Sequence, residues 1–261
     1  MDLRLTGKLA VVTGASKGIG LAITRGLLTE GARVIAGARD PSAELTELTK
    51  RSDVNHVAVD LSDHSGPPQL IAVARKHGPI DVLVNNVGAV TPRVDGFLAV
   101  PDDSWLASLN LTFLAAVRTT RAALPDMLAA GSGTIVNVSS VNAFLPDPTV
   151  IDYCAAKAAL TNFTKALSQE LGPTGIRVNS VSPGPVATGL WLGDHGVAAT
   201  IAQVHGDDPA TIEQAAASQM ATGRFTRPEE VADLVVLLAS ERAGNVTGSD
   251  FMIDGGLIKT L

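Results

Sequence analysis

The sequence predicts an α/β fold in which one parallel sheet is covered by helices on both faces. Short apolar runs rich in β-branched residues alternate with longer segments of helical periodicity, and this strand–helix order repeats along the chain. Because the runs are apolar almost throughout, they are typical of parallel strands buried on both faces. We therefore expect a doubly wound, right-handed arrangement of seven strands.

The expected strands leave room for a connecting segment between neighbours. They comprise residues 9–13, 33–36, 56–59, 82–85, 134–138, 177–181 and 249–253. A strong helix is expected over residues 228–240, because Pro228 followed by Glu229 and Glu230 suits a helix N-terminus. The strand–helix order therefore runs almost to the end of the chain.

Residues 188–226 interrupt this order. Gly, Asp and Ala dominate the segment, and connections of this length are usually functional. We predict that it forms a substrate lid over the carboxyl edge of the sheet. The sequence contains no internal repeat or low-complexity tract, so we expect a single dinucleotide-binding and catalytic domain over residues 1–261.

Composition excludes several classes of function. The formal net charge is -6 and basic residues are scattered, so nucleic acid is not an expected partner. No apolar run approaches the ~20 residues that span a bilayer, and we expect a cytoplasmic protein without a membrane partner. A single cysteine, Cys154, excludes an intramolecular disulfide, and we expect it to be a packing residue. His195 and His205 lack a paired ligand pattern, so no metal site is predicted.

A glycine-rich motif follows the first expected strand and precedes a helical segment, which is the context of a dinucleotide site. The motif reads Gly14-Ala15-Ser16-Lys17-Gly18-Ile19-Gly20. Gly14 permits a sharp turn, Gly18 allows the backbone to approach a pyrophosphate, and Gly20 allows close helix packing. The alternative is a tight turn without a ligand, which the surrounding βαβ order disfavours. A Rossmann-type sheet is therefore predicted.

The Thr-Gly-x-x-x-Gly-x-Gly spacing resembles the short-chain dehydrogenase/reductase family, in the single-domain branch that includes 3-oxoacyl-carrier-protein reductases. The resemblance covers essentially the whole chain. Asn85-Asn86-Val87-Gly88 departs from the family pattern, because valine replaces the usual alanine. The cofactor-binding residues that the resemblance implies are Gly14, Ser16, Lys17, Gly18, Ile19, Gly20, Arg39, Asp60, Leu61, Asn86, Gly88, Tyr153, Lys157, Pro183, Gly184, Val186 and Thr188.

The end of the second expected strand favours NADP(H) over NAD(H). An NAD site would place an acidic residue there, but Gly37-Ala38 occupies the position and Arg39 follows. Arg39 and Lys17 are suited to flank a 2′-phosphate through charge-assisted hydrogen bonds. The alternative is that both are ordinary solvated cations, with Asp40 neutralising Arg39. Asp60 matches the family position that contacts the adenine amino group, although a helix N-cap is the alternative.

Tyr153 and Lys157 stand four residues apart in a helical stretch, so both project from one helix face. A phenol with an ordinary pKa near ~10 is a poor proton shuttle at neutral pH, whereas a nearby ammonium and an oxidised nicotinamide favour the phenolate. We therefore predict that Lys157 lowers the pKa of Tyr153. The alternative is that the pair has no catalytic role, with a packed phenol beside a surface lysine.

Ser140 lies thirteen residues before Tyr153, at the end of an expected strand, which matches the spacing of the family's catalytic serine. Ser139 is its rival, but neighbouring strand residues point to opposite faces. Asn110 resembles the family asparagine whose backbone holds a water linked to the lysine. The resemblance implies that Tyr153 protonates the carbonyl oxygen, Ser140 polarises it and Lys157 binds the ribose hydroxyls.

The lid favours a free ketone over a carrier-bound substrate. It contains no Lys or Arg between residues 188 and 223 but several acidic residues, which disfavours docking of an acidic carrier protein. We expect a small or medium apolar ketone or alcohol, with Asn142, Val150 and Trp191 as candidate pocket residues. The resemblance also implies a homotetramer or dimer, formed through helices that begin near residues 101 and 151 and through the last strand.

Four functions remain to be separated. The first is an NADPH-dependent carbonyl reductase, and the second is an NAD-dependent alcohol or hydroxysteroid dehydrogenase. The third is a non-catalytic NADP-binding regulator, which would have little need for Asn110, Ser140, Tyr153 and Lys157 together. The fourth, a sugar epimerase, usually has a longer chain with a C-terminal substrate domain. We favour the carbonyl reductase.

Overall fold

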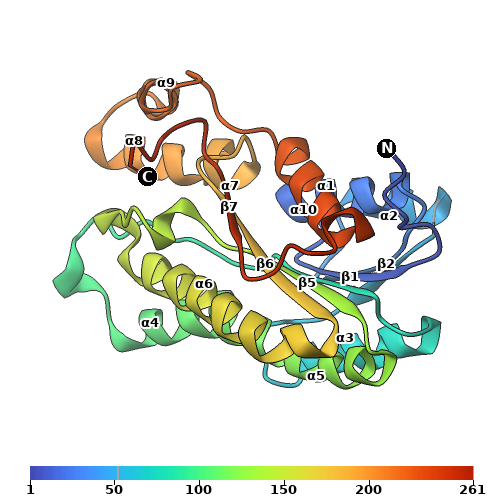
Figure 1. Cartoon of the computed structure of the whole chain (residues 1–261). Helices are drawn as coiled ribbons and strands as arrows, with labels where there is room; N and C mark the ends of the chain where they lie inside the picture. Colours follow the sequence, from blue (N-terminus) through green and yellow to red (C-terminus); the bar gives the residue numbers. More distant parts are fainter. Residues whose placement is uncertain (52, 261) are drawn as a thin grey trace.

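A seven-stranded parallel sheet forms the centre of the computed structural model, which describes residues 1–51 and 53–260 (Figure 1). The strand order is β3-β2-β1-β4-β5-β6-β7, so β2 and β3 are added on one side of β1 and the strands from β4 onward on its other side. The strands are β1 Leu9–Thr13, β2 Arg33–Ala38, β3 Val54–Ala58, β4 Val82–Asn85, β5 Gly133–Val138, β6 Ile176–Pro183 and β7 Asp250–Ile253. The predicted fold class is confirmed.

Helices cover both faces of this sheet. The α-helices are α1 Gly18–Thr29, α2 Ala43–Arg51, α3 Gly66–Ala74, α4 Asp102–Leu109, α5 Ala115–Ala130, α6 Ile151–Leu171, α7 Gly189–Leu192, α8 Val197–His205, α9 Pro209–Gln219 and α10 Pro228–Ala239. A π-helical turn, η3 Asn110–Leu114, joins α4 to α5. None of the helices in the described part of the chain is both long and apolar enough to cross a membrane.

The alternation of side chains along β1 explains the two layers. Ala10 and Val12 belong to the core that packs against α1 and α10, whereas Leu9 and Val11 belong to the core that packs against α3 and α5. Every residue of β1 is buried. A strand that is apolar at each position is therefore what a sheet covered on both faces requires.

The strands differ from the predicted ones mainly at their ends. β2 continues through Gly37 to Ala38, because β1 and β3 pair with it on both sides. This pairing outweighs the weak strand preference of glycine. β6 likewise continues to Pro183 beside β7. Helix α10 begins at Pro228 as predicted and ends at Ala239, where Ser240 is the C-cap residue.

Residues 188–226, which we call the lid, contain helices α7, α8 and α9 rather than an irregular loop. Asp208 caps α9 by accepting a hydrogen bond from the backbone N–H of Ala210 at 3.1 Å. In Figure 1 the orange helices α8 and α9 form a lobe beyond the end of the sheet at which β6 finishes. This is the edge at which open α/β sheets bind ligands.

Candidate functional site

The glycine loop, residues 14–20, connects β1 to α1 in a conformation that requires glycine. Gly14 and Gly18 have positive φ angles of 65° and 54°. A Cβ atom at Gly20 would lie 2.2 Å from the carbonyl oxygen of Gly14, so no side chain fits there. The loop therefore brings the start of α1 directly beneath the backbone of the preceding turn.

The first turn of α1 offers its backbone N–H groups to an anion. Lys17 is the N-cap residue, no side chain caps the helix, and no acidic residue occupies the first turn. An uncapped helix N-terminus beside a glycine turn suits a pyrophosphate. The loop thus has the donor chemistry and the close backbone approach that a dinucleotide needs.

Asn86 fixes this loop from the neighbouring strand. Its Nδ2 atom donates to the carbonyl oxygens of Thr13 at 2.9 Å and Gly14 at 3.2 Å. Its backbone N–H donates to Oγ1 of Thr13, also at 2.9 Å. The predicted cofactor residue therefore also acts as a structural clamp between the ends of β1 and β4.

At the end of β2, Arg39 is exposed and carries no salt bridge within the described residues. Asp40 therefore does not neutralise it, contrary to the alternative considered above. Lys17 is also exposed and without a carboxylate partner in this part of the chain. Both cations stay available to a phosphate group.

Asp60 lies in a turn after β3 rather than at a helix N-cap, which is Ser65 for the following helix. Its carboxylate accepts hydrogen bonds from the backbone N–H and the hydroxyl of Ser62, at 2.9 and 2.7 Å. These bonds hold the pKa of Asp60 below its ordinary value, and the Arg39 charge adds to the effect. Leu61 beside it is buried in the core.

The two serines after β5 point in different directions. Ser139 shares a 2.6 Å hydrogen bond with the hydroxyl of Thr161 on α6. Ser140 instead accepts a hydrogen bond from the backbone N–H of Asn142 at 3.1 Å and donates one to Oδ1 of Asn142 at 3.3 Å, and its hydroxyl is close enough to Tyr153 to lower the pKa of that phenol. The geometry therefore favours Ser140 over Ser139 as the partner of the phenol.

Tyr153 and Lys157 lie on one face of α6, with the Lys157 Nζ atom 5.6 Å from the centre of the phenol ring. Nζ also donates to the carbonyl oxygen of Val138 at 2.6 Å. Burial raises the pKa of Tyr153 to about 12, against a lowering by the Ser140 hydrogen bond, and lowers the pKa of Lys157 to about 7. The expected lowering of the phenol pKa by Lys157 is not observed in the chain alone, where burial raises this pKa and Ser140, not Lys157, lowers it.

Asn110 begins the π-helical turn, and its side chain bonds to Ser62 and Arg118. Its Nδ2 atom donates to the carbonyl oxygen of Ser62, and its Oδ1 atom accepts from Arg118, both at 2.6 Å. Its carbonyl oxygen accepts from the backbone N–H of Ala115, which closes the wide turn. The side chain therefore ties η3 and the start of α5 to the turn that carries Asp60.

The segment after β6 crosses to the glycine loop. Gly184 packs so closely on Asp254 that a Cβ atom would lie 2.9 Å from its Cα atom. Val186 then pairs with Thr226, and Thr188 comes within reach of Gly18, where a Cβ atom would lie 3.3 Å from the threonine methyl. Pro183, Gly184, Val186 and Thr188 thus border the same edge as the glycine loop.

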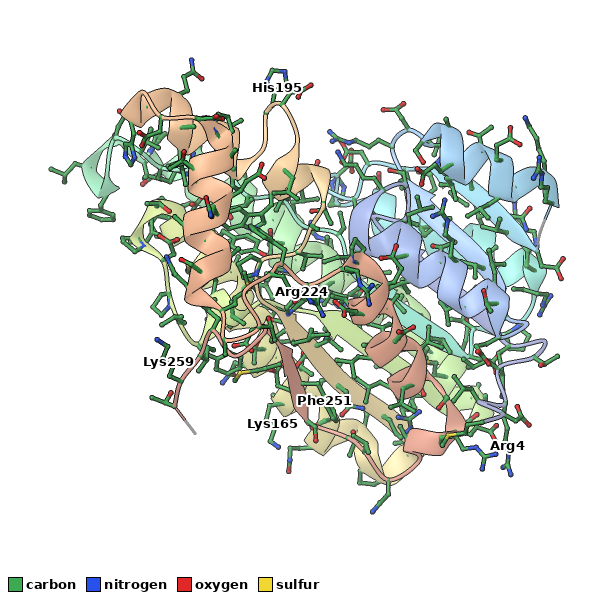
Figure 2. The ribbon with its side chains drawn as sticks, turned by 90° about the horizontal axis from the view of Figure 1, so that it is seen from above. Arg4, Lys165, His195, Arg224, Phe251 and Lys259 are labelled. Atoms are coloured by element: carbon green, nitrogen blue, oxygen red, sulfur yellow. The ribbon has the colours of Figure 1, made fainter. Side chains whose placement is uncertain are left out.

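Trp191 and His195, the remaining lid residues considered in the sequence, have different surroundings. Trp191 packs edge-to-face on Phe225, with 5.3 Å between ring centres. His195 projects outward at the tip of the loop between α7 and α8 (Figure 2). Within residues 1–51 and 53–260, no group of three or more His, Cys, Asp or Glu side chains is placed to hold a metal ion.

Sequence reasoning missed an ion pair formed by Asp152, the residue directly before Tyr153. Arg93, in the connection between β4 and α4, donates two hydrogen bonds to the buried carboxylate of Asp152, at 3.2 and 2.5 Å. The backbone N–H of Arg93 also donates to the carbonyl oxygen of Thr149 at 2.6 Å. Asp152, directly before Tyr153, was a weak sequence signal for this contact, because Asp147 lies in the same stretch.

Three features together define a nucleotide-dependent oxidoreductase: the switch in strand order between β1 and β4, the glycine loop, and the Ser140–Tyr153–Lys157 group. The short chain dehydrogenase family model matches residues 8–194, and the chain belongs to this family. The family binds a nicotinamide cofactor, and its members related to this chain act on CH–OH and C=O groups.

Three relatives illustrate the similarity. The chain is 35% identical to the 3-oxoacyl-[acyl-carrier-protein] reductase of Thermotoga maritima, over 98% of this chain and 100% of the relative. It is 36% identical to the L-xylulose reductase of Bos taurus over the full length of both. The crystal structure of L-sorbose reductase from Gluconobacter frateurii, complexed with NADPH and L-sorbose, superposes over 100% of both chains with a TM-score of 0.91 and 36% identity.

Proposed function

We propose that the protein is an NADP(H)-dependent reductase that interconverts a small or medium apolar ketone and its secondary alcohol. The observation that carries the proposal is the grouping of Ser140, Tyr153 and Lys157 at the carboxyl end of β5. A buried hydroxyl, a partly buried phenol and a buried ammonium grouped in this way are suited to general acid–base catalysis at a carbonyl oxygen.

Each residue has a separate task in this proposal. The Tyr153 hydroxyl donates its proton to the carbonyl oxygen of the substrate, and Ser140 holds that oxygen in place by a hydrogen bond. The ammonium of Lys157, beside the ring, returns a proton to the phenolate and binds the ribose hydroxyls. The bound nicotinamide supplies a hydride to the carbonyl carbon, or accepts one in alcohol oxidation.

The cofactor preference rests on the end of β2. Arg39 is exposed, next to the Asp60 turn, and free of a carboxylate partner within the described residues, and no acid follows Gly37 until Asp40. A guanidinium in this position gains more from a 2′-phosphate than from a 2′-hydroxyl. The NADPH bound to the related L-sorbose reductase supports the same preference.

The substrate class rests on apolar side chains that stay exposed around the site. Phe144 and Leu145 follow Ser140 in the chain, and Leu190 and Leu192 lie on α7 of the lid; all four are between 39% and 47% exposed. Burying such surfaces against a ligand is favourable only when the ligand is apolar. This favours an apolar ketone, although the named relatives also include reductases of the sugars L-xylulose and L-sorbose.

We also propose a homodimer or homotetramer. Leu106 on α4 is 63% exposed and Met252 on β7 is 46% exposed, and both lie on the elements for which self-contact was predicted. Sedimentation of the purified protein would test this, and a monomer at micromolar concentration would contradict it.

The decisive experiment compares initial rates for aliphatic, aryl, steroid, thioester and sugar ketones, with NADPH and NADH in parallel. Tyr153→Phe is expected to lower kcat by about 10²- to 10⁴-fold while NADPH still binds. Phe163→Leu, an aromatic change further along the same helix, serves as the control and should keep the rate. Undiminished turnover by Tyr153→Phe would contradict the mechanism, and NADPH binding without any turnover would favour a regulatory role.

A further inference from the structure

The first turn of α6 carries Tyr153 but begins without a side-chain cap. Val150 is the N-cap residue, and it offers no side-chain hydrogen bond to the free N–H groups that follow. Tyr153 is the third residue of the helix, and helix ends with unsatisfied N–H groups tend to fray. A phenol in this position therefore needs another contact to keep it in place.

The ion pair of Arg93 and Asp152 supplies such a contact. Asp152 is the second residue of α6, and its two carboxylate oxygens accept hydrogen bonds from Nε and Nη2 of Arg93. The Asp152 side chain is 3% exposed and that of Arg93 is 18% exposed. Bidentate, charge-assisted bonds are stronger and more directional than neutral ones, and burial protects them from water. The pair therefore fixes the residue directly before Tyr153.

Arg93 reaches α6 from another part of the chain. The thiol of Cys154, also in the first turn, accepts from Asn142 Nδ2 at 3.4 Å and from the backbone N–H of Asp147 at 3.3 Å. Both of these partners lie in the same β5–α6 connection. Among the hydrogen bonds of the described residues, those of Arg93 are the ones that join this turn to a segment outside that connection. They set the position of the turn relative to the rest of the site.

The segment that carries Arg93 is itself anchored at the cofactor edge. It begins at Asn86, which holds the glycine loop through three hydrogen bonds. It then passes the catalytic group at Gly88, where a Cβ atom would lie 3.6 Å from Nζ of Lys157. Residues 86–93 therefore connect the glycine loop to the start of α6, and the ion pair closes this connection.

We propose that Arg93 and Asp152 are positioning residues that hold the Tyr153 hydroxyl in line with the substrate carbonyl oxygen. The inference rests on the proposed ketone reduction and adds two residues to it. The pair acts through the helical turn that carries the phenol and not through contact with the reacting atoms. A displacement of about 1 Å in such a group lowers the rate of the chemical step strongly, because the reacting atoms must be aligned.

Removal of one partner alone does not test this role. It leaves an unpaired buried charge, which destabilises the fold whatever the pair does in catalysis. The double variant Arg93→Met/Asp152→Leu removes both charges, and apolar pairs often replace buried ion pairs without loss of stability. We expect its denaturant midpoint to lie near that of the wild type. Its kcat for ketone reduction should fall about tenfold to 10²-fold, with KM for the ketone and NADPH affinity within about twofold of wild type.

Arg93→Lys keeps the charge and provides a second, milder variant. A lysine ammonium neutralises Asp152 but lacks the planar fork that fixes the direction of the carboxylate. Its kcat should lie between those of the double variant and the wild type. If the double variant does not fold, a folded Arg93→Lys protein with wild-type kcat overturns the proposal.

The control is a second arginine–aspartate pair. Arg75, the C-cap residue of α3, pairs with Asp126 near the end of α5 at 2.7 Å. Both residues shortly precede strands, so this pair lies at the amino edge of the sheet, opposite the catalytic group. Arg75→Met/Asp126→Leu should keep the wild-type kcat. An equal loss of kcat in the control and in Arg93→Met/Asp152→Leu overturns the proposal.

Hydrogen exchange provides a readout that does not depend on activity. In an α-helix the N–H groups of residues 155–158 bond to the carbonyl oxygens of residues 151–154, so their exchange reports how firmly the first turn is held. Exchange in peptides that cover residues 155–158 should be faster in Arg93→Met/Asp152→Leu than in the wild type, and exchange in α10 should be unchanged.

The outcomes separate this proposal from the proposed function. Wild-type kcat in a folded double variant, or exchange of residues 155–158 at the wild-type rate, overturns the positioning role. A rise in KM at unchanged kcat also overturns it, because the pair would then act in substrate binding. If the wild-type protein reduces no ketone, the proposed function fails, while the exchange rates still decide whether the pair holds the first turn of α6.

Discussion

The glycine loop and the lid border the same edge of the sheet, yet they are held in opposite ways. The glycine loop is fixed by hydrogen bonds from residues far away in the chain, including those from Asn86 and from Gly14 to Gly37. Residues 189–219 of the lid form hydrogen bonds only with residues up to five positions away, within the part of the chain that the structure describes.

The difference concerns how each region tolerates change. Distant bonds and close backbone contacts leave the loop a single conformation, because each constraint comes from a different strand. The lid depends on a few buried residues such as Val197, Ala198 and Ala202, and on the contact of Trp191 with Phe225. Substitutions in the glycine loop should therefore affect folding and cofactor binding. Substitutions in the lid should affect mainly the binding of the substrate.

The largest expected effect comes from the buried lysine. Burial lowers the pKa of Lys157 from 10.5 to about 7, so between these values the unfolded chain binds more protons than the folded one. Stability of the wild type therefore rises with pH through this window. Lys157→Met lacks the titration, and its unfolding free energy relative to wild type should fall by a few kcal/mol between pH 7 and 10.

Denaturant unfolding at several pH values in that range measures this effect. Lys165→Met, on the exposed side of the same helix, is the matched control. Parallel stability curves for Lys157→Met and wild type would show that the folded protein accommodates the ammonium without cost.

A pair of glycine substitutions, one in the glycine loop and one in the lid, compares the two regions directly. In Gly20→Ala the new methyl group overlaps the Gly14 carbonyl, so we expect a loss of about 1–3 kcal/mol in unfolding free energy and little remaining NADPH affinity. In Gly189→Ala nothing lies within 4 Å of the methyl group, and stability should change by less than about 0.5 kcal/mol. Equal losses in both variants would remove the distinction between the two regions.

Arg39→Ala should change cofactor preference without changing the fold. Loss of a charge-assisted bond to the 2′-phosphate is expected to raise KM for NADPH about tenfold, which is about 1.4 kcal/mol, and to leave KM for NADH unchanged. Lys50→Ala, at an exposed position on α2, is the control. If both cofactors weaken equally, Arg39 does not recognise the phosphate.

Trp191→Ala should have only a small effect on the chemical step. The edge-to-face pair with Phe225 contributes about 0.5–1.5 kcal/mol at most beyond its buried area. We expect KM for the ketone to rise while kcat stays close to wild type, because the residue lies outside the Tyr153 group. A loss in kcat at unchanged KM would instead connect the lid to the chemical step.

The sequence was most informative where a local pattern determines the structure. The seven strands and the glycine turn follow from apolar runs and glycine spacing, although β2 extends beyond its predicted end because strand pairing outweighs the preference of Gly37. The spacing of Ser140 to Tyr153 predicted that the two side chains lie close together, and the Ser140 hydroxyl does act to lower the pKa of Tyr153. Their roles with substrate and cofactor stay predictions.

Features that depend on distant partners escaped the sequence. The Arg93–Asp152 pair joins residues 59 positions apart, and the side chain of Asn110 reaches Ser62 over 48 positions. No periodicity encodes such contacts. The three lid helices were also missed, because α7 has only four residues and the glycines and aspartates between the helices dominate the pattern of the segment.

The clamp formed by Asn86 has a consequence for the order in which the protein folds. Its partner Thr13 lies 73 residues earlier, so the glycine loop cannot be held until β4 has docked beside β1. Contacts between distant residues form late, because the intervening chain must first be ordered. During synthesis, the first strand–helix–strand unit therefore emerges before the glycine loop is held in place. The nucleotide-binding loop reaches its final conformation only after residue 86 has left the ribosome.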